Sequence, residues 1–225
     1  MTDLAFQNFV IEAGVFGFFA EPLTLKSGRK SHFYVNWRKA TNDAFQLDQL
    51  SDFLTAFIRA EGLVCDTLYG VPEGASKTAV ITAMKLARTS PLFATGSHVI
   101  SMGRAKPKDH GDPADRFFIG EPRGATWVLE DTITTGLSLF KCLDQLFEAR
   151  IDVRGVICLT DRCERRDDGK TVAATLAERY GPQFTYRAMS RAPDLLRQMI
   201  QKNRPAPALL AALAAELGVD PSALQ

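Results

Sequence analysis

The feature that most restricts the fold of this chain is a regular alternation between short apolar runs and longer segments with helical spacing. The apolar runs lie at residues 66–71, 97–104, 125–130, 153–161 and 183–189. Segments whose apolar residues recur every three or four positions lie between most of them, at residues 74–88, 136–150 and 170–181. Strands that alternate with helices form βαβ units around a parallel sheet, so the sequence predicts an α/β fold.

The two ends of the chain are expected to add structure outside this repeat. Apolar spacing predicts an opening helix over residues 4–13 and another over 47–58. Two short extended pieces around a Ser-Gly turn are predicted within residues 21–38. The tail, residues 191–225, is predicted to form one or two helices that break near Pro205 and Pro207.

Composition narrows the class of protein. The chain has 225 residues, which suits one domain with an extension, and a net charge of +1, which gives no reason to expect a nucleic-acid partner. No apolar run approaches the roughly 18 residues of a membrane span, and the first residues do not resemble a signal peptide. The cysteines show no CxxC pair and are expected to be reduced thiols. These points predict a cytoplasmic protein with no membrane partner.

Ligands of parallel α/β sheets bind at the carboxyl ends of the strands. Three segments follow strand ends here and are therefore expected to lie together: residues 70–77, 130–138 and 161–166. The candidate site should be assembled from these three segments.

The stretch "TWVLEDTITTGLSLF" (residues 126–140) carries the clearest chemical signal. A helix start near Gly136 would present free backbone N–H groups and a partial positive charge to a phosphate. Thr134, Thr135 and Ser138 would add hydroxyl donors. Glu130 and Asp131 would repel a phosphate but would accept hydrogen bonds from the vicinal hydroxyls of a ribose. The stretch predicts a cradle for ribose 5-phosphate; the alternative is a helix capped by Thr135 beside two solvated acids.

The same stretch resembles the phosphoribosyl-pyrophosphate (PRPP) signature of the type I phosphoribosyltransferases. The turn "GVPEGASKTA" (residues 70–79) resembles that family's pyrophosphate-binding turn, but Ser76-Lys77 stands where an apolar-Pro pair is usual. Lys77 adds positive charge there, or the turn has diverged. The resemblance implies PRPP contacts from a distributed set: Lys26, Glu73, Gly74, Lys106, Glu130, Asp131, Thr132, Thr134, Thr135, Gly136 and Ser138.

Three further segments resemble the orotate phosphoribosyltransferases. They are "LTLKSGRKSHFYVN" (residues 23–36), "GRAKPKDHGD" (103–112) and "LTDRCERRDDG" (159–169), and they occur in the family's order. The resemblance implies an orotate pocket, and the rigid guanidinium fork of Arg162 suits that planar anion. Phe33 or Tyr34 would wall the ring, although core packing is the alternative for both. The implied orotate contacts are Lys26, Phe33, Tyr34, Thr134 and Arg162.

The charged loop at residues 103–118 resembles the family's mobile catalytic loop. Its cations suit a departing pyrophosphate, and His110 could supply a proton to the leaving oxygen. Ala105 replaces a second basic residue that is usual after the arginine. The resemblance implies that the loop reaches into a neighbouring subunit, so a homodimer is expected. The implied catalytic residues are Arg104, Lys108, His110 and Asp131.

The resemblance implies a phosphoribosyltransferase domain at residues 1–190, with helices on both sheet faces and an N-terminal hood at 1–40. Residues 191–225 would be a helical C-terminal extension. The implied reaction transfers ribose 5-phosphate from PRPP to orotate with Mg²⁺, for which no protein ligand is assigned. Two alternatives remain open: transfer to a purine or uracil, and a PRPP-sensing regulator that binds RNA or DNA.

Overall fold

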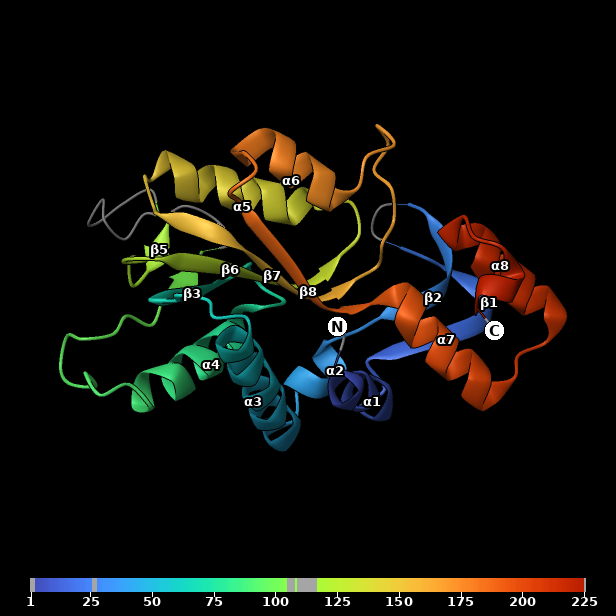
Figure 1. Cartoon of the computed structure of the whole chain (residues 1–225), viewed down its shortest axis with the longest axis horizontal. Coiled ribbons are helices and arrows are strands. Elements are labelled where there is room, and N and C mark those ends of the chain that lie inside the picture. Colours follow the sequence, from blue (N-terminus) through green and yellow to red (C-terminus); the bar gives the residue numbers. More distant parts are fainter. Residues whose placement is uncertain (1–2, 26–27, 105–107, 109–116, 225) are drawn as a thin grey trace.

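The computed structural model describes residues 3–25, 28–104, 108 and 117–224. Its centre is a six-stranded sheet with the order β5-β4-β3-β6-β7-β8 (Figure 1). All neighbouring strands pair in parallel except β4 and β5, which are antiparallel. The strands are β3 (Thr67–Gly70), β4 (Met102–Gly103), β5 (Phe118–Ile119), β6 (Thr126–Ile133), β7 (Val153–Asp161) and β8 (Thr185–Arg191). The predicted α/β class and parallel sheet are confirmed.

Helices cover both faces of the sheet. The pair α3 (Ala44–Ala60) and α4 (Ser76–Arg88) lies on one face, and the pair α5 (Leu137–Glu148) and α6 (Val172–Tyr180) lies on the other (Figure 1). Successive strand residues point to opposite faces, so Leu129 packs in one apolar cluster and Val128 in the other. This two-sided burial explains why β6 and β7 read as continuous apolar runs.

The N-terminal segment and the tail pack together at one end of the sheet. The segment comprises α1 (Leu4–Glu12), the antiparallel strands β1 (Phe16–Thr24) and β2 (Lys30–Val35), and the short α2 (Arg38–Thr41). The tail forms α7 (Ala192–Asn203), α8 (Pro207–Leu217) and the 3-10 turn η2 (Pro221–Leu224), and α8 lies beside β2 (Figure 1). The predicted break near Pro205 and Pro207 is confirmed. Tail residues share an apolar core with α1 and α3, among them Leu195, Leu196 and Leu213.

Two predicted strand boundaries were wrong. Strand β4 contains only Met102 and Gly103, because its pairing with β3 and β5 does not extend beyond these residues. Strand β6 continues past the two acids to Ile133, because β7 offers parallel partners as far as Asp161. Pairing with a neighbouring strand, which no local pattern reveals, decides both ends. In the part of the chain that the structure describes, no helix combines the length and apolarity that crossing a membrane requires.

Candidate functional site

A cavity of about 560 Å³ opens where β6 and β7 end, and the segment from β2 to α2 forms its opposite wall. It is lined by Leu25, residues 34–38, residues 130–138, Lys141 and Arg162. Two of the three strand-end segments expected at the site, those after β6 and β7, thus contribute to the lining. The third segment, after β3, does not line the cavity, but its Gly74 lies against Asp131, which does.

The turn from β6 into α5 has the geometry of an anion cradle. Gly136 precedes the first helical residue and adopts a left-handed conformation, with φ of +74°. An added Cβ there would lie 3.0 Å from the Phe140 ring and 3.1 Å from Val172, so glycine is favoured by both backbone and space. No side chain caps the helix. The alternative of a Thr135 cap is therefore wrong, and the open helix N-terminus faces the cavity.

Glu130 and Asp131 occupy the cavity floor beside this turn. Glu130 is 5% exposed and accepts a 3.3 Å hydrogen bond from the Ser138 hydroxyl. Asp131 accepts a 2.7 Å bond from the Thr132 N–H. Burial raises the pKa of both carboxyl groups, and the charge of Asp131 raises the pKa of Glu130 further; the Thr132 N–H and the Arg38 charge partly oppose the shift at Asp131. Glu130 is buried and Asp131 is half-buried, and both border the cavity, where their oxygens can accept hydrogen bonds from donors such as sugar hydroxyls.

We expect Glu130→Gln to stabilise the ligand-free protein at neutral pH and to flatten its pH dependence. The folded-state pKa of Glu130 lies above its ordinary value of 4.5. Between these two values the folded state binds more protons than the unfolded state, so the free energy of unfolding falls as pH rises through that window. Glutamine does not titrate and removes this contribution.

Denaturant unfolding of both proteins from pH 4.5 to pH 8 measures the effect. Asp131 also has a raised pKa and keeps part of the slope. Identical slopes for wild type and variant would show that Glu130 ionises in the folded protein as freely as in the unfolded chain.

The turn after β3 contacts the acids through Gly74. An added Cβ at this residue would overlap Asp131 Oδ2 and lie 2.7 Å from the carboxyl carbon. Neither Gly74 nor the exposed Glu73 lines the cavity, and the Pro72–Glu73 peptide bond is cis. The Lys77 ammonium donates instead to Thr41 O and Asn42 Oδ1, at 3.1 Å each. Lys77 therefore contacts the end of α2. This contact does not support the interpretation that Lys77 adds positive charge to the turn.

Gly74→Ala is expected to weaken PRPP binding by about tenfold or more, because the new methyl group displaces the Asp131 carboxylate by a large fraction of an ångström. Its φ is not in the left-handed region, so the backbone tolerates alanine. Gly17→Ala is the matched control, since its Cβ would meet only an ordinary 3.9 Å contact. Calorimetric titration with PRPP compares the two; equal affinities would separate Gly74 from the position of Asp131.

The predicted base-pocket residues divide into two groups. Tyr34 lines the cavity, as expected. Phe33 does not: its ring is fully buried, stacks on Phe16 and lies 4.0 Å beneath the Arg162 guanidinium carbon. The expectation that Phe33 walls the ring was therefore wrong, and the core-packing alternative holds for it. Alternation along β2 sends Tyr34 to the cavity and Phe33 to the core.

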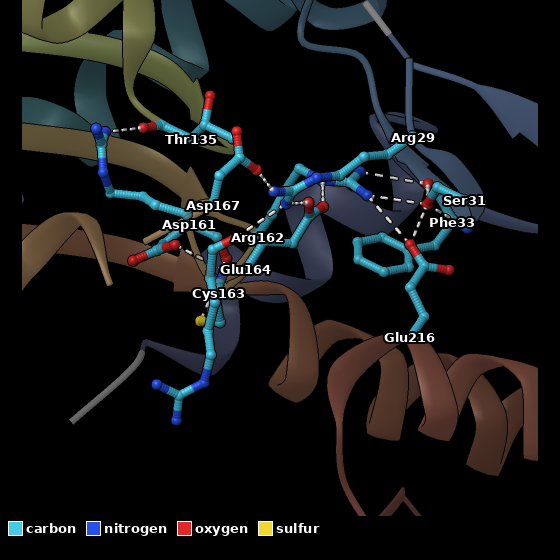
Figure 2. A network of polar contacts seen from close by, with 12 residues as sticks. Arg29, Ser31, Phe33, Thr135, Asp161, Arg162, Cys163, Glu164, Asp167 and Glu216 are labelled. Atoms are coloured by element: carbon cyan, nitrogen blue, oxygen red, sulfur yellow. Dashed lines mark hydrogen bonds and ion pairs between the residues drawn. The ribbon is translucent and has the colours of Figure 1, made fainter. Parts of the chain in front are cut away.

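Arg162 lines the cavity but is only 2% exposed, and most of its donors are engaged within the protein (Figure 2). Its Nε donates to Glu164 at 2.5 Å, Nη1 to Phe33 O at 3.3 Å, and Nη2 to Ser31 Oγ at 2.9 Å. Glu164 also pairs with Arg29 at 3.2 Å. Arg162 thus links β2 to the segment after β7 through hydrogen bonds. Its contact with orotate remains a prediction.

Sequence reasoning assigned no role to three basic residues at the site, although one of them, Arg166, lies in a segment that was expected there. Arg38 and Lys141 line the cavity. Arg166 donates at 2.5 Å to Thr135 O in the turn before α5, while its guanidinium lies 4.8 Å from the Phe140 ring centroid. The position of Lys141, three residues after Ser138 on the same helix, was an available signal. No local signal predicts that Arg38 lies at the site. It borders the cavity only because the segment from β2 to α2 lies opposite the end of β6.

Several predicted residues fall outside the described part of the chain: Lys26, Lys106 and His110. Arg104 and Lys108 are described. The Arg104 N–H donates to Phe117 O at 3.0 Å, so the two ends of the charged loop meet beside the β4–β5 pair. Within residues 3–25, 28–104, 108 and 117–224, no group of three or more His, Cys, Asp or Glu side chains is arranged to hold a metal ion.

Comparison with known proteins gives concordant results. No protein-family model matches the chain. The curated orotate phosphoribosyltransferase of Lachnoclostridium phytofermentans is 31% identical over 185 residues, covering 80% of this chain and 78% of that protein. The one from Aeromonas salmonicida is 26% identical over 211 residues, covering 93% and 92%.

Solved structures support the fold. The orotate phosphoribosyltransferase of Francisella tularensis superposes with a TM-score of 0.70 at 18% identity, covering 94% of this chain and 96% of that one. The Mycobacterium tuberculosis orotate phosphoribosyltransferase solved with PRPP has a TM-score of 0.55 at 19% identity, covering 85% and 96%.

Proposed function

The chain belongs to the orotate phosphoribosyltransferases, and on that premise we propose which of its residues carry each part of the reaction. The protein is a glycosyltransferase that moves ribose 5-phosphate from PRPP to orotate, giving orotidine 5'-phosphate and pyrophosphate in pyrimidine biosynthesis. The observation that supports the residue assignments best is the uncapped, glycine-initiated N-terminus of α5 next to the buried Glu130 and the half-buried Asp131 in one cavity.

The donor binds at the end of β6. The N–H groups that open α5 and the hydroxyls of Thr134, Thr135 and Ser138 hold the 5'-phosphate. Glu130 and Asp131 accept hydrogen bonds from the ribose 2'- and 3'-hydroxyls, and these donors favour the charged carboxylates over the protonated forms. Of the remaining PRPP contacts, Lys26, Thr132, Glu73, Gly74 and Lys106 stay predictions carried by the resemblance.

The acceptor binds between β2 and the segment after β7. Tyr34 walls the planar ring, and the face of Arg162 that borders the cavity supplies donors to the orotate anion. Lys26 and Thr134 complete the proposed base contacts. Phe33 contributes indirectly, by carrying the Arg162 guanidinium on its ring face and accepting a hydrogen bond at its carbonyl oxygen.

The protein's role in the reaction is positioning and charge stabilisation. The bond from C1 to pyrophosphate loosens, and N1 of orotate attacks the opposite face of the ribose ring. The donor set fits Mg²⁺, because the cavity floor presents the hard carboxylate oxygens of Glu130 and Asp131. Glu130 and Asp131 would be the protein groups that help to hold Mg²⁺, together with substrate and water oxygens, and the ion would supply neutralisation of pyrophosphate charge.

The charged loop is proposed to cover the leaving pyrophosphate, with Arg104, Lys106 and Lys108 offsetting its charge and His110 supplying a proton.

We also propose a homodimer in which this loop serves the neighbouring site. We further propose a cytoplasmic location, which suits the free thiols of all four cysteines. Residues 1–190 are proposed as the catalytic unit and 191–225 as an extension packed on it.

The test mixes the purified protein with PRPP, Mg²⁺ and a panel of orotate, uracil and purine bases. We expect a fall in orotate absorbance and no product from the other bases. Turnover of a purine or of uracil would transfer the function to the corresponding phosphoribosyltransferase. PRPP binding without any turnover would instead favour a PRPP-sensing regulator.

A further inference from the structure

We propose that Glu216, on the C-terminal helix α8, is a positioning residue that fixes the base end of the site and thereby sets the affinity for orotate. This inference rests on the proposed function. It assigns a role in substrate recognition to the extension, which the sequence alone left without one. The residue stands 54 positions after Arg162 and 185 after Ser31, yet it contacts both (Figure 2).

The contacts of Glu216 join two walls of the site. One carboxylate oxygen accepts hydrogen bonds from Ser31 Oγ and, at 3.4 Å, from Arg162 Nη2. The other accepts the His32 backbone N–H at 2.8 Å. Ser31 is 1% exposed, and the Glu216 side chain is 15% exposed. The carboxylate is therefore held by three donors in a largely dry environment, where such contacts are strong.

These contacts lie just behind the cavity wall. Ser31 and His32 belong to the same strand as Tyr34, which lines the cavity, whereas Glu216 does not line it. Arg162 borders the cavity on one side and meets Glu216 and Glu164 elsewhere. Glu216 thus fixes the guanidinium and the β2 backbone together, without touching the space that a substrate would fill.

The location of Glu216 is energetically costly unless its negative charge is compensated by hydrogen-bond donors. Glu216 is the only charged residue among the eleven of α8, and the helix buries Leu210, Leu213 and Ala214. It also stands in the last turn, where the helix dipole disfavours a negative charge. Hydrogen bonds to Arg162, Ser31 and His32 offset these costs.

The experiment compares wild type, Glu216→Gln and Glu178→Gln in steady-state assays with both substrates. Glu178 is the matched control, because it pairs with Lys170 on the surface, with its side chain 61% exposed. We expect Glu216→Gln to raise the KM for orotate by tenfold or more and to leave the KM for PRPP within about twofold. Glu178→Gln should match wild type in both. Glu216→Asp, which keeps the charge, should recover part of the orotate affinity.

The outcomes distinguish the proposed function from the proposed role of Glu216. Wild-type protein without orotate turnover would overturn the proposed function and, with it, this role. Active wild type combined with an unchanged, lowered or equally shifted pair of KM values in Glu216→Gln would overturn the role alone. If Glu216→Gln does not fold, Ser31→Ala removes the bridging hydroxyl, and the same KM criterion applies to it.

Discussion

Replacing Lys108 with alanine is expected to lower turnover by about 10²–10³-fold, the usual cost of losing one preorganised charge contact to a transition state. Pyrophosphate departs with growing negative charge, and Lys108 lies between Arg104 and Phe117, whose backbone contact joins the loop ends. Strand β4 precedes this loop and pairs in parallel with β3, so the loop begins at the carboxyl edge of the sheet that carries the cavity.

The effect should appear in kcat and not in folding. Circular dichroism and thermal unfolding are expected to match wild type, because Lys108 makes no contribution to either apolar cluster. Lys202→Ala provides a control, since it removes an equal charge from the exposed face of α7. Normal turnover in Lys108→Ala would remove Lys108 from the catalytic set and withdraw the proposed role of the loop.

Replacing Arg162 with alanine should have the largest effect on stability, a loss of about 3–5 kcal/mol in the free energy of unfolding. The substitution leaves Glu164 and Glu216 largely buried, with side-chain exposures of 9% and 15%, and without their shared cation. It also removes the guanidinium from the Phe33 ring and from Ser31 Oγ. Denaturant unfolding measures the loss.

Two comparisons give this prediction its specificity. Arg154→Ala breaks an exposed pair with Asp152 and should cost no more than about 1 kcal/mol. The double variant Arg162→Ala/Glu216→Gln should recover part of the lost stability, because it removes the charge of Glu216, whose ion pair is lost with Arg162, whereas Glu164 keeps its pair with Arg29. A loss below about 1 kcal/mol in Arg162→Ala would mean that water solvates both acids.

Any folded Arg162→Ala protein should also lose affinity for orotate far more than for PRPP. Equal losses of affinity for the two ligands would show that Arg162 does not belong to the base pocket.

Local patterns in the sequence were sufficient for the parallel sheet and for the turn between β6 and α5. Strand and helix signals in "TWVLEDTITTGLSLF" are contiguous, and the cradle uses groups from one turn, so short-range geometry places Gly136, Ser138 and the two acids together. The tail helices and the break between them could likewise be predicted from local sequence, because proline restricts the backbone wherever it occurs. Boundaries that depend on a neighbouring strand, such as the end of β6, were not.

The sequence by itself determined the alternation of elements, the order of the motifs and the glycine-initiated turn that we propose as the anion site, because each depends on residues within one or two turns of chain. Only the tertiary structure decided that Phe33 faces the core, that Arg38 and Lys141 border the cavity, and that Glu216 meets Ser31 from 185 residues away. The physical reason is that burial and charge pairing depend on which surfaces meet when the chain closes, and distant segments carry no local mark of that meeting.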